Sequence, residues 1–149
     1  MERAILYLYS SVISSPLSLN LGSGRNPMTG AVNVDIRKNT KTDIVADADA
    51  LPFISEIFDE AHAINPYGFN PVNPETARVL KPDGSLKVTG TAKNPFSAPL
   101  SPSQAGEAGF KLTETGAMQR VHQFGVQRTT SGGVLNTSAS GTTVYRKLP

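Results

Sequence analysis

Two glycines and an aspartate near the start of the chain have the types and spacing of a nucleotide-binding site. The apolar run 17–21 ends at Gly22-Ser23-Gly24, and the run from Val32 to Val34 ends at Asp35. Glycines at the carboxyl end of a strand let a ligand approach the backbone, and an acid ending the next strand can accept hydrogen bonds from ribose hydroxyls. Either feature alone is also typical of an ordinary turn or a solvated strand end. Together they favour a ligand site.

Four segments in this order resemble the class I S-adenosylmethionine-dependent methyltransferases, most closely their small, methyltransferase-type-11-like members. These are the Leu-x-Leu-Gly-x-Gly-x-x-Pro opening with its short link to Asn-Val-Asp, and then segments 43–53, 58–60 and 77–86. The resemblance covers roughly residues 17–94. It implies a reduced, Rossmann-like α/β fold, with a mostly parallel sheet and antiparallel C-terminal strands, and S-adenosyl-L-methionine as the cofactor. The implied cofactor contacts in this part are Leu21, Gly22, Ser23, Gly24, Asp35 and Ile36.

An acidic segment, Ala-Asp-Ala-Asp-Ala at 46–50, would face the adenine on that fold. Its small alanines leave room for a ring, and a carboxylate beside a backbone N–H can bind the exocyclic amine. Asp47 and Ala48 are therefore further candidate cofactor contacts, with Asp49 as an alternative acid and Leu51 as part of an apolar wall. The other interpretation is a turn in which the Asp side chains bond their own backbone.

The segment Asn65-Pro66-Tyr67-Gly68-Phe69 falls where the methyl group would be presented. Methyltransferases that act on base or glutamine amines place an (Asn/Asp)-Pro-Pro-aromatic motif there, in which an amide and a backbone carbonyl hold the amine and the ring stacks on it. The second proline is missing here, and Asn-Pro with Gly also makes an ordinary turn. Asn65 and Tyr67 are the candidate catalytic residues, Asn65 is also a candidate cofactor contact, and Thr91 and Lys93 should lie nearby.

Alternating elements must position these residues. The pattern predicts strands at 17–21, 31–36, 43–47, 59–65 and 85–91, helices at 2–13, 71–80 and 102–108, and extended segments at 110–128 and 142–148. The link between the first two strands is shorter than a parallel crossover normally needs, so its helix must be vestigial or replaced by a loop. Asn20 is expected to be a structural hydrogen-bonding residue and His62 to be packed.

The 149 residues fit a single domain, 1–149, with 38% hydrophobic and 17% charged residues and a net charge of only +2. That charge is too small to argue for nucleic acid by itself, although Arg25, Arg37, Lys38 and Lys41 cluster near the predicted strand ends. The absence of cysteine excludes disulfides and thiolate chemistry, and with two histidines we expect no metal site. The apolar stretch 4–9 is too short to cross a membrane.

These observations predict a cytoplasmic S-adenosylmethionine-dependent methyltransferase whose acceptor and oligomeric state are open. One alternative is a degenerate module of the same fold that binds an adenosine compound or a partner without turnover. A second is a dinucleotide-dependent enzyme, although the third glycine of that fingerprint is missing. A third concerns context: the chain could be the delivered part of a larger secreted protein.

Overall fold

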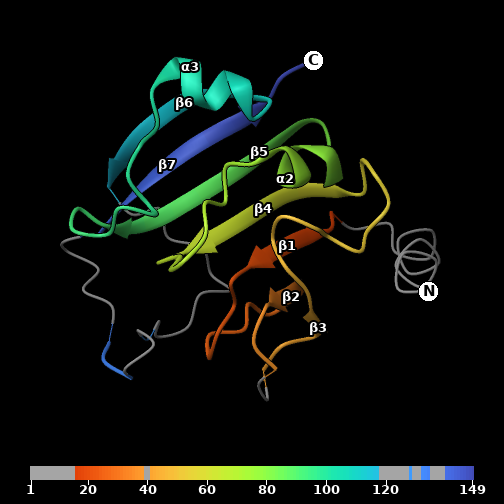
Figure 1. The fold of residues 1–149 in the computed structure, drawn as a ribbon, viewed down its shortest axis with the longest axis vertical. Helices are drawn as coiled ribbons and strands as arrows, with labels where there is room; N and C mark the ends of the chain where they lie inside the picture. Colours follow the sequence, from red (N-terminus) through yellow and green to blue (C-terminus); the bar gives the residue numbers. More distant parts are fainter. Residues whose placement is uncertain (1–15, 39–40, 118–127, 129–131, 135–139) are drawn as a thin grey trace.

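The computed structural model describes residues 16–38, 41–117, 128, 132–134 and 140–149. These residues form one seven-stranded sheet with the order β3-β2-β1-β4-β5-β7-β6 (Figure 1). Strands β1 to β5 run parallel, and β7 pairs antiparallel with both β5 and β6. The predicted α/β fold with a mostly parallel sheet is therefore confirmed. The strands are β1 (Ser18–Leu21), β2 (Ala31–Asp35), β3 (Ile44–Val45), β4 (Phe58–Ile64), β5 (Leu80–Thr91), β6 (Phe110–Ala117) and β7 (Ser140–Lys147).

The connections from β1 to β4 are short and carry no helix in the described residues, as the sequence predicts for the first of them. Residues 22–30 alone join the parallel neighbours β1 and β2. From β1 the chain steps outward to β2 and β3, and then returns to place β4 on the other side of β1. The point where strand order reverses in such a sheet is where ligands bind, outside the carboxyl ends of the strands.

Two short helices follow the later strands. Helix α2 (Pro74–Val79) begins after Asn73, whose side chain accepts a hydrogen bond from Thr76 N–H at 2.9 Å. Helix α3 (Pro102–Glu107) begins at a capping box between Ser101 and Gln104. In both, proline occupies the first turn, where its missing N–H costs nothing. The helices predicted at 71–80 and 102–108 are thus present, and α2 starts later than residue 71.

The start of β5 differs from the prediction. The sequence Lys-Pro-Asp-Gly predicts a loop before a strand from Ser85, whereas pairing with β4 already begins at Leu80, opposite Phe58. The register then shifts so that Glu60 pairs with Ser85, and the intervening residues bulge out. Gly84 permits this bulge, because a Cβ there would lie 2.8 Å from the Lys81 carbonyl oxygen.

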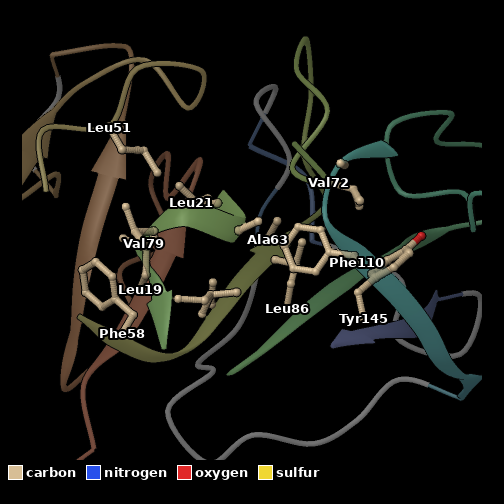
Figure 2. Packing of buried hydrophobic residues seen from close by; sticks show 14 of the residues in the cluster. Leu19, Leu21, Leu51, Phe58, Ala63, Val72, Val79, Leu86, Phe110 and Tyr145 are labelled. Carbon is tan, nitrogen blue, oxygen red and sulfur yellow. The ribbon is translucent and has the colours of Figure 1, made fainter. Parts of the chain in front are cut away.

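The two faces of the sheet differ in chemistry. One face carries the hydrophobic core, in which side chains from the strands pack with residues of both helices. Figure 2 shows part of this core, including Leu19, Leu86 and the α2 residue Val79. Rings of Phe110 and Tyr145 meet edge to face there, with centroids 6.3 Å apart. The other face carries buried polar side chains, among them Asn20, which donates to the Asn26 carbonyl oxygen and to Asn33 Oδ1. This is the structural role expected for Asn20.

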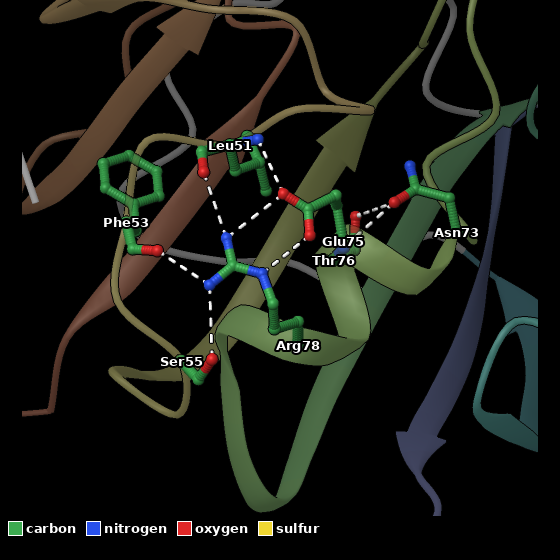
Figure 3. A network of polar contacts seen from close by, with 7 residues as sticks. All are labelled: Leu51, Phe53, Ser55, Asn73, Glu75, Thr76 and Arg78. Carbon is green, nitrogen blue, oxygen red and sulfur yellow. Dashed lines mark hydrogen bonds and ion pairs between the residues drawn. The ribbon is translucent and has the colours of Figure 1, made fainter.

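Arg78 on α2 ties the segment that precedes β4 to the helix (Figure 3). Its guanidinium donates to the carbonyl oxygens of Leu51 at 3.0 Å and Phe53 at 2.8 Å, and it pairs with Glu75 at 2.6 Å. Glu75 in turn accepts from Leu51 N–H at 3.0 Å. A planar, forked cation is suited to this arrangement because it satisfies several acceptors at once.

We expect Arg78→Ala to lower the free energy of unfolding by about 2–4 kcal/mol, because it leaves carbonyl oxygens and the Glu75 carboxylate without their partner. Urea denaturation would measure the loss. Arg78→Lys keeps the charge but not the fork, so it should recover only part of the stability. An Arg78→Ala protein as stable as wild type would contradict this role for the network.

The expected helix at 2–13 lies outside the described residues, as does the expected extended segment beyond residue 117, apart from Arg128. Among the helices that the structure describes, none is long and apolar enough to span a membrane.

Candidate functional site

A cleft of about 940 Å³ lies at the carboxyl ends of the parallel strands. Its walls come from the loops that follow β1, β2, β3, β4 and β5, so residues far apart in sequence meet there. Of the ten predicted site residues, the cleft is lined by Leu21, Gly22, Gly24, Asp35, Ile36, Asp47, Ala48, Asn65 and Tyr67. Ser23 is not among the lining residues; it is buried, and its N–H donates to the Val34 carbonyl oxygen at 3.0 Å.

The glycine turn after β1 requires glycine at two positions. Gly22 and Gly24 have φ angles of +65° and +51°, in the left-handed region that side chains disfavour. A Cβ on Gly22 would lie only 2.7 Å from Phe69 Cε1, so the ring of Phe69 packs directly over this turn. At Gly24 a Cβ would have ordinary space, with Asp35 Oδ2 4.0 Å away. At Gly22 and Gly24 the wall of the cleft is therefore formed by backbone alone.

Asp35 at the end of β2 holds the glycine turn in place. Its Oδ2 accepts from Gly24 N–H at 2.8 Å, and its Oδ1 accepts from Arg37 N–H at 2.8 Å. The residue is only 6% exposed, which rules out the alternative of a solvated strand end. Each carboxylate oxygen retains further acceptor capacity beside these bonds. Asp35 can thus both shape the turn and accept a hydrogen bond from a ligand in the cleft.

The acidic segment after β3 forms the self-bonded turn that was one of the two interpretations made from the sequence, and it also lines the cleft. Asp47 Oδ1 accepts from Asp49 N–H at 2.9 Å, and Ala50 N–H donates to the Asp47 carbonyl oxygen at 3.0 Å, which is a turn closed by its own side chain. Asp47, Ala48 and Asp49 nevertheless all line the cleft. Leu51, expected in the pocket wall, is instead fully buried in the core.

The Asn65 segment leaves β4 in a strained turn. Asn65 has a φ of +48°, which Asn tolerates better than most residues, and its N–H donates to the Thr89 carbonyl oxygen at 2.5 Å. Tyr67 is 77% exposed and meets the ring of Phe96 edge to face at 5.6 Å. Thr91 and Lys93, expected nearby, line the cleft.

Asn94 and Phe96 also line this end of the cleft, and neither was predicted from the sequence. Asn94 Nδ2 donates to Asn65 Oδ1 at 2.8 Å and to the Pro66 carbonyl oxygen at 2.9 Å. The only sequence signal was the Asn94-Pro95 dipeptide, which marks a turn at the exit of a strand. Nothing in that dipeptide indicates contact with a loop some thirty positions earlier.

Basic residues outnumber acidic ones around the cleft. The basic lining residues are Arg25, Arg37, Lys38, Lys93 and Arg128, against Asp35, Asp47 and Asp49. Lys41, which the sequence groups with the first three, does not line it. The backbone of Arg128 is held by the side chain of Asn26 through two hydrogen bonds of 2.8 Å, which places this later segment beside the glycine turn.

On the polar face of the sheet, the half-buried Glu60 lies against the buried His62. His62 is 1% exposed, as expected for a packed residue, and its Nε2 lies 3.1 Å from Glu60 Oε1. Ser18 donates to the same oxygen at 3.2 Å, and Lys87 Nζ lies 3.6 Å from Oε2. The close polar contact with His62, aided by the attraction of His62 and Lys87, lowers the pKa of Glu60 from 4.5 to about 2 despite partial burial.

Because this pKa is lower in the folded protein than in the unfolded chain, Glu60 contributes stability above pH 4.5 that is lost as the pH falls toward 2. We expect Glu60→Gln to lower the free energy of unfolding near neutral pH by on the order of 1–2 kcal/mol, and by less at about pH 3. Urea denaturation at both values would measure this. Glu107→Gln, which removes an exposed carboxylate at the end of α3, is the control. A difference from wild type that stays constant with pH would contradict the account.

No protein-family model matches the chain, and no curated protein matches it either. Solved structures do match. An antibiotic-related methyltransferase is 17% identical with a TM-score of 0.65, over 97% of this chain and 93% of that one. A 16S rRNA (adenine(1408)-N(1))-methyltransferase from Catenulisporales acidiphilia, solved with its cosubstrate SAM, is 10% identical with a TM-score of 0.62, over 100% and 92%.

A further match comes from the complex between the Haloferax volcanii Trm112 methyltransferase activator and the putative methyltransferase. It is 14% identical with a TM-score of 0.54, over 99% of this chain and 91% of that one. At these identities the likeness concerns the fold. The chain has the fold of class I S-adenosylmethionine-dependent methyltransferases.

Proposed function

We propose that the cleft binds S-adenosylmethionine and that the chain, as a single domain, transfers a methyl group to an acceptor amine. The observation that carries this proposal is the meeting of three groups around one cleft: the glycine turn 22–24, the buried Asp35 and the segment 65–67. The shared fold of solved methyltransferases supports it.

The residues present fit this cofactor. Gly24 leaves open space where a side chain would stand, and Asp35 retains acceptor capacity for a ribose hydroxyl. Ile36, 65% exposed, and the small Ala48 offer apolar contact for a ring, with Asp47 beside them for its amine. When bound, the cofactor would supply an already activated methyl group, so the protein mainly has to position the acceptor.

The methyl acceptor would bind at the end of the cleft that is lined by the segment 65–67. Asn65 Oδ1 and the Pro66 carbonyl oxygen are two hydrogen-bond acceptors that converge on one nitrogen atom. Tyr67, the next residue in the chain, has an exposed ring that packs edge to face on Phe96. Two acceptors and a ring suit a planar amine that donates both of its hydrogens. The basic lining favours an anionic substrate, for which nucleic acid is the first candidate.

Methyl transfer is tested by incubating the chain with S-adenosylmethionine carrying a labelled methyl group and separate pools of RNA, protein and small molecules. Label should enter one of the pools, and RNA is the expected one. A chain that binds the cofactor but labels none of the pools would overturn catalysis. It would favour the second candidate, a module that binds without turnover. The missing helix between β1 and β2 supports this second candidate.

Asp35→Ala should weaken binding of S-adenosylhomocysteine by about 1–3 kcal/mol, because it removes a charged acceptor and releases the glycine turn. Titration calorimetry would measure this change. Asp43→Ala is the matched control, since Asp43 also accepts a backbone N–H, that of Asn33 at 2.8 Å, but lies outside the cleft lining. Unchanged affinity in Asp35→Ala would refute the ribose assignment.

A further inference from the structure

The side-chain amide of Asn94 donates hydrogen bonds to the two oxygens proposed above to bind the substrate amine. Its Nδ2 lies 2.8 Å from Asn65 Oδ1 and 2.9 Å from the Pro66 carbonyl oxygen, so both amide hydrogens are donated. Its Oδ1 accepts from Phe96 N–H at 2.9 Å. A backbone N–H can only donate, which fixes the oxygen of Asn94 toward Phe96 and its NH₂ group toward the acceptors. Asn65 must then present its oxygen.

The hydrogen bonds of Asn94 connect two loops at this end of the cleft. The loop after β4 contributes Asn65, Pro66 and Tyr67, and the loop after β5 contributes Asn94 and Phe96. Besides the amide contacts, the Tyr67 and Phe96 rings pack edge to face. The planar NH₂ group of Asn94 donates to two oxygens at the end of the cleft that Tyr67 and Phe96 also line, and it therefore has the chemistry expected of the proposed substrate's amine.

We propose that Asn94 is an internal competitor for the acceptor site: its carboxamide NH₂ takes the place of the substrate amine, and the substrate enters by displacing it. This rests on the proposed function for the identity of the site, but not on turnover. The matching substrate group is the exocyclic amine of a nucleobase, because the basic lining residues around the cleft attract a nucleic-acid backbone. Because of this competition, a substrate group that cannot replace both hydrogen bonds of the Asn94 amide would bind weakly.

The competition reduces the apparent affinity for the substrate, since the site can bind the substrate amine only when Asn94 is displaced. Asn94→Ala should therefore increase affinity for cytidine about tenfold, in line with two released hydrogen bonds, while affinity for uridine, which has a carbonyl in place of the amine, stays unchanged. The measurement is NMR titration of labelled protein with the cofactor site filled by S-adenosylhomocysteine. Ser97→Ala is the control, because Ser97 Oγ holds the same loop through the Thr91 and Asn94 carbonyl oxygens. It should give no gain that is selective for cytidine.

A second readout uses the wild-type chain, so it does not depend on the folding of a variant. The Asn94 side-chain NH₂ signals, assigned in the wild-type spectrum from their contacts with the backbone protons of Asn94, should exchange slowly with solvent and become fast when cytidine saturates the site. Exchange that stays slow would overturn the proposal, as would an equal effect of Asn94→Ala on cytidine and uridine. A gain for N-acetylglutamine methylamide without one for cytidine would overturn the nucleobase assignment. Failure to bind S-adenosylhomocysteine alongside a cytidine-selective gain would instead overturn the proposed function alone.

Discussion

Replacing Gly22 with valine should abolish measurable binding of S-adenosylhomocysteine while leaving the sheet folded. The φ of +65° is unfavourable for a β-branched residue, and the new Cβ would stand 2.7 Å from Phe69 Cε1. Either Phe69 moves into the cleft or the turn moves away from Asp35. We expect the dissociation constant to rise at least about 100-fold, together with a loss of about 1–3 kcal/mol in unfolding free energy. Calorimetry and urea denaturation would measure the two effects.

Gly30→Val provides the matched control for backbone strain. Gly30 lies in the same link between β1 and β2 and has a φ of +81°, but a Cβ there would meet nothing within 4 Å. It also lies outside the cleft lining. The variant should lose stability and keep its affinity. If both valine variants lose stability and both keep their affinity, Gly22 serves only as a turn residue.

Asn65→Ala should lower turnover by about 100-fold or more while changing affinity for S-adenosylhomocysteine by less than about threefold. The expected reason is that Asn65 Oδ1 acts on the acceptor amine. Labelled methyl transfer and calorimetry would separate the two quantities. Asn65→Asp keeps an acceptor oxygen and the tolerance for a φ of +48°, so it should retain more turnover than the alanine variant. Equal losses of turnover and affinity in Asn65→Ala would make Asn65 a structural turn residue.

The parts of the fold that could be predicted are those with local causes. The runs 17–21 and 31–34 end at glycine or acid, and Asn73, Pro74, Ser101 and Pro102 mark helix starts by their own chemistry. The early start of β5 could not be predicted. It depends on the pairing of Leu80 with Phe58 in β4 and on the bulge that follows, which Gly84 accommodates.

The site was predictable to a similar degree. Strand ends in a parallel sheet meet at one edge, which is why Asp35, Asp47 and Asn65 come together around the cleft. The side-chain bonds that shape it are tertiary. Neither the clasp of Asn94 on Asn65 nor the burial of Leu51 follows from the residues around them. Periodicity places a side chain on a face of the sheet but does not name its partner.

We expect the cleft at the carboxyl edge of the sheet to bind an adenosine cofactor of the methyltransferase kind. The most direct test is calorimetric titration of the wild-type chain with S-adenosylmethionine, S-adenosylhomocysteine and NAD in parallel. We expect saturable binding of the first two at one site per chain, competition between them, and no binding of NAD. Binding of NAD, or no binding of either sulfur compound, would contradict it.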